Sequence, residues 1–350
     1  MNPIYIHILP VAISFISTLL FLFFCYEFSI SIGLYDKPNW RKKHIGKVPL
    51  IGGIAIIFGF LFGCLVSPRA LSEWKPLFLS MMPLAVIGVM DDHGDISVKK
   101  RMVTQVLTCL IMIYYGNIYL NNFGDLLGLG FNITFIGLET LVTIFCVVGV
   151  INALNLIDGI DGLCGNLCLI TCFSIIFIVL IQKNTASIAL IIYFSSALIA
   201  FLIVNLGLTK RIINKVFLGD AGTTAIGFFL SWHLIKLSNG SEAVFRPIFA
   251  IWILAVPIMD TLGVIFRRLI RKKSPFESGR DHIHHLLILL GFSSKMALLV
   301  ITMLSMIFAL LGIASEYYNI PESYSFYTIL IIFIAYAYLT NYLFRRVEND

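Results

Sequence analysis

Long, uninterrupted apolar stretches dominate this 350-residue chain and leave little choice of fold. Hydrophobic residues make up 59% of the sequence and charged residues only 13%, and the mean hydropathy is +0.94. Because soluble domains carry about 25% charged residues, the composition excludes an ordinary soluble protein. A helix needs about 20 mainly apolar residues to cross a bilayer. The chain is therefore predicted to be an all-α polytopic membrane protein.

The apolar stretches divide into eleven predicted transmembrane helices. They cover residues 4–28, 50–66, 76–90, 102–120, 133–154, 163–181, 185–207, 217–237, 247–266, 296–315 and 324–344. The first stretch is longer than a signal-peptide core and no small-residue cleavage pattern follows it, so we expect a retained helix. Since no repeat or change in composition marks a boundary, residues 1–350 are expected to form one integral-membrane domain.

The distribution of basic residues indicates the orientation, because Lys and Arg are retained in short cytoplasmic loops. With a periplasmic N-terminus, 20 of the 25 Lys and Arg residues fall on the cytoplasmic side. An odd number of helices then places the C-terminus in the cytoplasm. The formal charge of +6 is spread over separate loops, so it indicates membrane orientation and contact with anionic lipids or phosphorylated substrates rather than nucleic acid.

Four polar clusters interrupt the apolar sequence, and the predicted topology places all of them at the cytoplasmic face. The first contains Asp91, Asp92 and Asp95, directly after an apolar stretch. Adjacent carboxylates repel each other unless a cation or a proton lies between them, so this cluster is a candidate for Mg²⁺ binding or for a raised pKa. A solvated loop with a helix-capping Asp would give the same sequence.

The second cluster contains Asn152, Asn155, Asp158 and Asp161, which recur every three residues and so lie roughly on one side of a helix. Glycines after the two aspartates allow a tight turn. Oxygen ligands that converge at the membrane edge suit a hard divalent cation that also binds phosphate oxygens. The alternative is a re-entrant turn whose side chains only satisfy backbone groups.

The third cluster opens the predicted helix 217–237 with Phe217, Gly219 and Asp220. Gly219 and Asp220 could serve only as a helix cap. The NH groups at a helix N-terminus also bind phosphates, so a diphosphate site is the functional alternative. Phe217 is a candidate for stacking on a nucleobase, although an aromatic residue beside a membrane also acts as an interface anchor.

The fourth cluster contains Arg280, His282, His284 and His285, in a loop that also holds Arg268. Three histidines could bind zinc, but no Cys lies nearby and the carboxylates of the other clusters favour magnesium. Arginine and histidine together suit phosphate oxygens, with Arg as a planar fork and His as a hydrogen-bond donor or proton carrier.

Taken in order, these motifs resemble the polyprenyl-phosphate N-acetylhexosamine-1-phosphate transferase superfamily, and most closely its bacterial branch that acts on UDP-GlcNAc and undecaprenyl phosphate. The resemblance runs nearly end to end. It rests on the segments 33–44 and 49–53, Asp91-Asp92-x-x-Asp95, the segment 152–162, the segment 216–222 and Arg280-x-His282-x-His284-His285.

The resemblance implies transfer of GlcNAc-1-phosphate from UDP-GlcNAc to undecaprenyl phosphate with release of UMP, as the first membrane step of O-antigen or enterobacterial common antigen synthesis. It implies Mg²⁺ or Mn²⁺ as cofactor and an active site on the cytoplasmic face of the bacterial inner membrane. The expected partners are UDP-GlcNAc, undecaprenyl phosphate and the bilayer, with no nucleic acid and with a homodimer left open.

Three alternatives remain at this point. The donor could be another UDP-N-acetylhexosamine or UDP-MurNAc-pentapeptide. The reaction could proceed through an aspartyl-phosphate instead of the direct attack that we expect from a lipid phosphate. An ion-coupled transporter is a more remote alternative, because it would carry its acids near the midplane rather than at one edge.

The roles implied by the resemblance fall into three sets. Asp220 and Asn155 would bind the metal. The catalytic set is Asp91, Asp92, Asp158, Asp161, His282, His284 and His285. The substrate-binding set is Asp36, His44, Asp95, Asn152, Phe217, Arg268 and Arg280. In these sets, Asp91 or Asp92 is expected to orient or deprotonate the lipid phosphate.

Overall fold

A computed structural model describes residues 5–37, 46–68, 71–182, 188–240, 243–274 and 279–349. Within these ranges the chain is mainly helical, as predicted. The helices are η1 (Tyr5–His7), α1 (Ile8–Ser31), α2 (Gly52–Leu65), α3 (Leu71–His93), α4 (Val98–Tyr114), α5 (Glu139–Ile157), α6 (Leu163–Ile181), α7 (Ala189–Asn205), α8 (Gly219–Ser238), α9 (Pro247–Ile253), α10 (Ala255–Ile270), α11 (Ile283–Leu289), α12 (Ser294–Tyr317) and α13 (Glu322–Asn349). A two-stranded antiparallel sheet pairs β1 (Tyr35–Asp36) with β2 (Val48–Pro49).

Each of the eleven predicted stretches contains a helix in the structure. In the described part of the chain, six helices are long and apolar enough to cross a membrane, namely α1, α3, α5, α6, α12 and α13. The bent pair α9–α10 adds a seventh if it forms one crossing, and α2 and α7 are shorter apolar helices. These findings support a multi-pass membrane protein, whereas eleven crossings and their orientation remain predictions.

Two predicted boundaries differ from the structure around a long connection. The prediction ended one helix at 120 and began the next at 133, but α4 ends at Tyr114 and α5 begins at Glu139. Asn117 adopts a φ of +51°, and four glycines between the two helices also have positive φ values. This left-handed backbone conformation is incompatible with a continuing α-helix, so the chain turns repeatedly here.

The predicted stretch 247–266 is broken into α9 and α10, which meet at an angle of 77°. Pro257 explains the break, because proline lacks an NH and its ring clashes with the carbonyl four residues earlier. That carbonyl belongs to Ile253, the last residue of α9, and it accepts a hydrogen bond of 3.0 Å from Thr171 Oγ1 on α6. A neighbouring helix thus satisfies the group that the proline frees.

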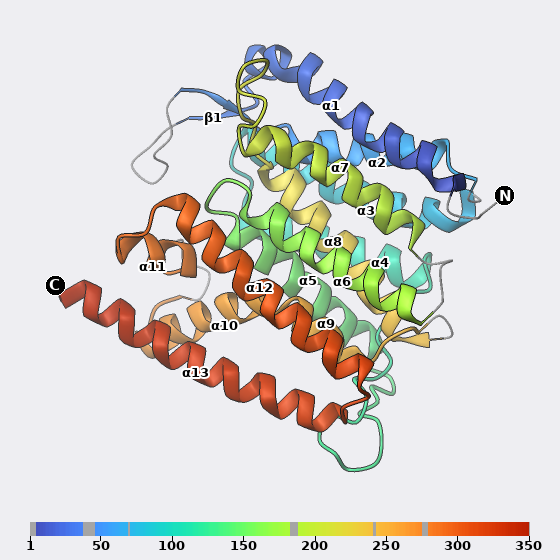
Figure 1. The fold of residues 1–350 in the computed structure, drawn as a ribbon, viewed down its shortest axis with the longest axis vertical. Helices are drawn as coiled ribbons and strands as arrows, with labels where there is room; N and C mark the ends of the chain where they lie inside the picture. The colour runs from blue at the N-terminus through green and yellow to red at the C-terminus, as the bar shows by residue number, and fades with distance from the viewer. Residues whose placement is uncertain are drawn as a thin grey trace.

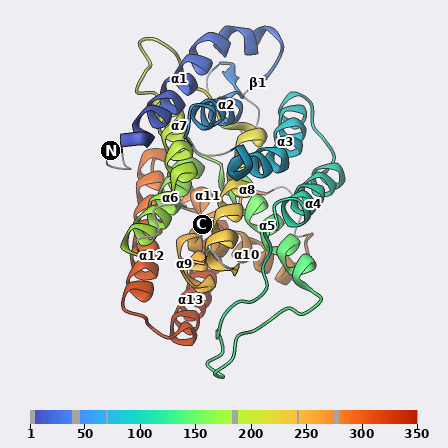
Figure 2. The same cartoon turned by 90° about the vertical axis from the view of Figure 1, so that its right-hand side faces the viewer.

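Helix α8 lies at the centre of the bundle in both views (Figure 1 and Figure 2) and contacts α2, α3, α5, α6 and α9. Residues Ala221–Ile235 of this helix are all buried. The chain termini lie at opposite ends of the bundle, and β1 and α11 lie toward the same end as the C-terminus (Figure 1). Asp220, from the third polar cluster, therefore lies in the first turn of the most enclosed helix.

Glycines bring the neighbouring helices against the start of α8. A Cβ on Gly88 of α3 would overlap the Cα of Ala221, and a Cβ on Gly53 of α2 would overlap the backbone of Gly222. Contacts this close are made backbone to backbone, so the helices cannot accept a larger residue without moving apart.

We expect Gly88→Ala to reduce the stability of the purified protein by about 1–3 kcal/mol, because the added methyl group must separate α3 from α8. The matched control is Gly149→Ala on α5, where a Cβ would meet no atom within 4 Å. This control should be neutral or slightly stabilising, since Ala favours helix over Gly. Thermal unfolding in detergent measures both, and equal midpoints for the two variants would contradict the close approach.

Candidate functional site

The first turn of α8 is held in place by the segment that precedes α2. The backbone NH of Phe217 donates to the carbonyl of Pro49 at 2.8 Å, and the carbonyl of Phe217 accepts from the NH of Gly52 at 3.0 Å. Gly219 then begins the helix with a φ of +72°, a conformation that favours glycine. These bonds fix the position of Asp220, the next polar residue, relative to β2 and α2.

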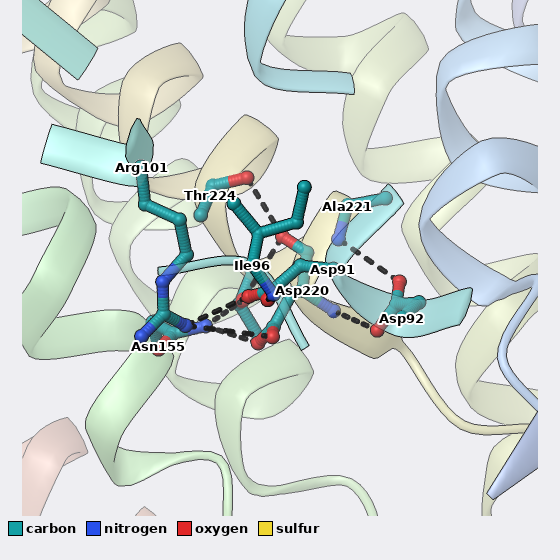
Figure 3. Close-up of polar contacts among 9 residues, drawn as sticks. Asp91, Asp92, Ile96, Arg101, Asn155, Asp220, Ala221 and Thr224 are labelled. Atoms are coloured by element: carbon teal, nitrogen blue, oxygen red, sulfur yellow. Dashed lines mark hydrogen bonds and ion pairs between the residues drawn. The ribbon is translucent and has the colours of Figure 1, made fainter. Parts of the chain in front are cut away.

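Asp92 of α3 caps α8 from another helix (Figure 3). Its Oδ1 accepts from the backbone NH of Asp220 at 2.8 Å, and its Oδ2 accepts from the NH of Ala221 at 3.2 Å. A carboxylate stabilises a helix N-terminus through these bonds and through the helix dipole. A Cβ on Gly219 would lie 2.5 Å from Oδ2 of Asp92, so the cap also requires glycine at this position.

The carboxyl group of Asp220 faces partners from two further helices (Figure 3). Its Oδ1 accepts from Nδ2 of Asn155 on α5 at 2.6 Å, and the same amide donates to Thr223 Oγ1 at 2.8 Å. Nη1 of Arg101 on α4 lies 3.8 Å from Oδ2 of Asp220. The Asp220 side chain is still 35% exposed, so a ligand can reach it.

Asp91 lies beside Asp220 and within hydrogen-bonding reach of its carboxyl group. Oδ2 of Asp91 accepts from Arg101 Nη1 at 2.7 Å, and Oδ1 accepts from the NH of Ile96 at 2.6 Å. The Asp91 side chain is only 5% exposed. Two carboxylates in contact therefore share one arginine, and such a pair favours a proton or a cation between its members.

This donor set fits a divalent cation of the magnesium type. Mg²⁺ is usually bound by one or two carboxylates and completes its coordination with water and substrate phosphates. Asp220 with Asp91 supplies the carboxylates, and Asn155 holds Asp220 in position. Among the described residues, no group of three or more His, Cys, Asp or Glu side chains is arranged to bind a metal by itself. The fit is thus to a metal shared with a phosphorylated substrate.

Asp158 and Asp161 lie between α5 and α6, next to the same pocket. Burial raises the pKa of Asp158 to about 7, and the nearby Asp220 carboxylate adds to the effect. A carboxyl group with such a pKa can exchange a proton near neutral pH. Asp161 pairs with Lys215 at 2.8 Å, and the ammonium group of Lys215 lies 4.9 Å from the centre of the Phe217 ring.

The histidines contact this pocket at Gly159, against which His284 packs. His284 is 1% exposed, and a Cβ on Gly159 would overlap its Nε2. The His282 and His284 rings are nearly parallel with centroids 5.9 Å apart, and the His284 and His285 centroids are 4.1 Å apart. Neither ring nitrogen of His284 has a hydrogen-bond partner among the described residues. Unpartnered polar atoms this deeply buried are typical of a ligand-binding position.

His284 and His285 are neutral near pH 7. Burial, together with the neighbouring His285, lowers the pKa of His284 to about 3. Burial likewise lowers the pKa of His285 to about 4, with added repulsion from His282 and Arg280. Positive charge for a diphosphate must therefore come from arginines and lysines rather than from His284 and His285.

A basic cavity of about 230 Å³ borders residues 279–285, which we call the histidine loop. Its charged lining is Arg267, Arg268, Arg271, Lys273, Arg280 and Asp281. Arg268 Nη2 and Nε donate to the two Asp281 carboxylate oxygens at 2.7 and 2.8 Å. Burial alone would raise the pKa of Asp281, but the bonds and charge of Arg268 outweigh it and the pKa is lowered. The loop is thus locked to α10 by a bidentate ion pair.

The structure does not join every predicted residue to this pocket. Nδ2 of Asn152 donates to Gln105 Oε1 and to the Val148 carbonyl, each at 2.8 Å, so Asn152 ties α5 to α4. Asp95 is exposed in the turn after α3, and Asp36 lies in β1. His44 lies outside the described residues.

Three polar residues of this region escaped the sequence prediction. Arg101 bridges Asp91 and Asp220, Lys215 pairs with Asp161, and Asp260 binds His282. Only Asp260 carried a signal that could have identified it, since it is the lone charged residue in the interior of the apolar stretch 247–266.

Comparison with known proteins agrees with the motifs. The model of the family described as glycosyl transferase family 4 matches residues 74–238, which include Asp91, Asp92, Asn155 and Asp220. Curated relatives are similar along nearly the whole chain, and those named here are all undecaprenyl-phosphate alpha-N-acetylglucosaminyl 1-phosphate transferases.

The relative from Haemophilus influenzae is 38% identical over 96% of this chain and 95% of its own length. The Yersinia pestis protein is 37% identical over 93% of this chain and 88% of its own. The Escherichia coli K12 protein is 36% identical over 95% and 89%, respectively. The chain therefore belongs to glycosyl transferase family 4, together with these undecaprenyl-phosphate sugar-phosphate transferases.

Proposed function

We propose that this protein transfers GlcNAc-1-phosphate from UDP-GlcNAc to undecaprenyl phosphate, which yields undecaprenyl-diphospho-GlcNAc and UMP. The observation that carries the proposal is the meeting of Asp91, Asn155 and Asp220 at the first turn of α8. The names of the relatives, which cover most of the chain, support the same substrates. The product would begin an O-antigen or enterobacterial common antigen type of polysaccharide.

The reaction needs no nucleophile from the protein. An oxygen of the lipid phosphate attacks the phosphorus that carries the sugar, a new P–O bond forms, and the bond from this phosphorus to the bridging oxygen of UMP breaks. Phosphoryl transfer of this kind is catalysed mainly by positioning and by neutralising charge. A pocket of fixed carboxylates, amides and arginines is suited to that task.

Asp220, with Asn155 and Asp91 beside it, would hold Mg²⁺ or Mn²⁺. The metal, when bound, neutralises charge on the diphosphate. The ammonium group of Lys215, which pairs with Asp161, lies over one face of the Phe217 ring, and the opposite face would stack on the uracil. Asp158 is suited to proton exchange with the lipid phosphate because of its pKa of about 7.

The loop residues complete the proposed binding site. His284 and His285 would hydrogen-bond the sugar and diphosphate as neutral rings, and Arg268 and Arg280 would supply positive charge. Asp36, Asp95 and Asn152 would act around this pocket rather than in it. Asp92 differs from the other acids, since both of its oxygens cap α8 and its task is to position Asp220.

The protein is proposed to lie in the bacterial inner membrane with its pocket facing the cytoplasm, the compartment in which UDP-sugars are made. The excess of basic residues in the loops on that side supports this orientation. The location of β1, α11 and the C-terminus toward one end of the bundle is consistent with it (Figure 1). A homodimer is compatible with the proposal and is not required by it.

The function is tested with purified protein, undecaprenyl phosphate, Mg²⁺ and a panel of UDP-sugars, by measuring UMP release and the lipid product. We expect UDP-GlcNAc to be used best and a chelator to abolish release, with recovery on adding Mg²⁺ or Mn²⁺. Preference for UDP-MurNAc-pentapeptide would replace the proposed donor. Absence of UMP release with every donor would refute transferase activity.

Asp220→Asn should lower kcat by at least about 100-fold, because it removes a charge from the proposed metal site at the reacting diphosphate. The protein should remain folded, since the α8 cap on Asp92 involves only the backbone of residue 220. Glu139→Gln is the matched control, as Glu139 is a half-buried acid in the first turn of α5, away from this pocket. Turnover of Asp220→Asn at the control rate would remove Asp220 from the metal site.

Asp92→Ala should reduce stability by about 0.5–2 kcal/mol and lower activity too, because both the cap and the position of Asp220 are lost. Asp92→Asn should retain more of both, since its amide oxygen can still accept one of the two NH bonds. Thermal unfolding and initial rates distinguish the variants. If both variants lose activity equally while stability is unchanged, the charge of Asp92 takes part in the chemistry.

A further inference from the structure

One fully buried carboxylate lies apart from the acidic pocket. Asp260 is 0% exposed, on α10, three residues after the proline that bends the helix. Its Oδ2 is 2.8 Å from Nδ1 of His282, and its Oδ1 accepts from the NH of Ile283 at 2.8 Å and from the Tyr336 hydroxyl at 3.1 Å. Three donors from two other segments thus converge on one side chain.

Burying such a carboxylate costs free energy, and an apolar residue of similar size would often give an equally stable fold. The cost is offset only because each oxygen has a well-placed donor. The arrangement also links three parts of the chain, since Asp260 lies on α10, His282 directly precedes α11, and Tyr336 lies on α13. This location points to a role in holding the histidine loop.

The bond to Asp260 determines the state of the His282 ring. A carboxylate accepts hydrogen bonds and cannot donate them, so Nδ1 of His282 must carry the proton. The other nitrogen, Nε2, is then left to accept or carry a proton elsewhere. A carboxylate that orients a functional histidine in this way acts on the reaction through that histidine.

His282 stands where this orientation matters. Its ring lies nearly parallel to that of His284, which packs against Gly159 beside Asp158. The loop is anchored on its other side as well, because Arg267 donates to the backbone carbonyl of Asp281 and to Thr340 Oγ1 on α13. Together α10 and α13 therefore hold His282 through Asp260 and Arg267.

We propose that Asp260 is a positioning residue for the transfer reaction, which fixes the Nδ1-protonated form and the ring orientation of His282 so that Nε2 acts on the bound diphosphate or sugar. This inference rests on the proposed function for its kinetic consequence. The position of the proton on the His282 ring is inferred from the hydrogen-bond geometry alone.

The kinetic test is a double-mutant cycle of Asp260→Asn and His282→Gln, assayed with UDP-GlcNAc and undecaprenyl phosphate. Asp260→Asn should lower kcat by about 10- to 100-fold and leave KM for UDP-GlcNAc nearly unchanged. The double variant should be no slower than the slower single variant, because Asp260 acts through His282. Multiplicative losses, or a kcat for Asp260→Asn within two-fold of wild type (about 0.4 kcal/mol), would overturn the proposal.

Tyr336→Phe is the matched comparison, since it removes a donor to Oδ1 of Asp260 and leaves the bond from Oδ2 to His282 in place. It should lose less activity than Asp260→Asn. An equal loss in kcat would assign the effect to the packing of α13, not to the state of His282, and would count against the proposal.

A second measurement uses the wild-type chain and does not depend on the folding of any Asp260 variant. In ¹⁵N NMR of histidine-labelled protein in detergent, the signal that disappears in His282→Gln should show the proton on Nδ1. A proton on Nε2 alone would overturn the inference. If wild type transfers no sugar phosphate, the proposed function fails, whereas this measurement still decides the role of Asp260 toward His282.

Discussion

The capping of α8 by Asp92 is the interaction on which the pocket depends. The first turn of a helix leaves backbone NH groups without partners, and α8 is buried from Ala221 onward, so little water can satisfy them there. The side chain of Asp92 from α3 supplies an acceptor for two of them. Because the cap holds the backbone of residue 220, it also sets where the Asp220 carboxyl meets Asn155 from α5 and Arg101 from α4.

The packing around this turn explains why small residues recur there. Gly53, Gly88 and Gly219 each let a backbone or a carboxylate come closer than any side chain would permit. The helices α2, α3 and α8 consequently approach one another without intervening side chains. The polar groups at the ends of α3 and α8 therefore lie within hydrogen-bonding distance of each other. In a membrane protein, where apolar burial discriminates little between helix faces, such close contact contributes much of the specificity of packing.

Hydropathy was sufficient to locate a helix in each of the eleven predicted stretches, because apolar length is what distinguishes a membrane helix. It could not reveal the bend at Pro257 or the early end of α4, which depend on single residues and on turns. Motif order led to the family and to Asp91, Asp158 and Asp220. The pairing of these acids could not be predicted, since whether an Asp caps a helix, like Asp92, or faces a ligand, like Asp220, depends on contacts between distant segments. For the same reason Asp260 appeared in the sequence only as an isolated charge in an apolar stretch.

The attachment of the histidine loop to α13 has a consequence for how the protein is made. Tyr336 and Thr340 belong to the last helix of the chain, yet they hold Asp260 and Arg267, which in turn fix His282 and Asp281. When α1 to α12 have been inserted, every acidic group of the pocket is present, but the two side chains of α13 that bind Asp260 and Arg267 are still missing. The histidines therefore reach their full hydrogen bonding only after α13 has docked, so we expect chains that lack α13 to use the lipid substrate more slowly.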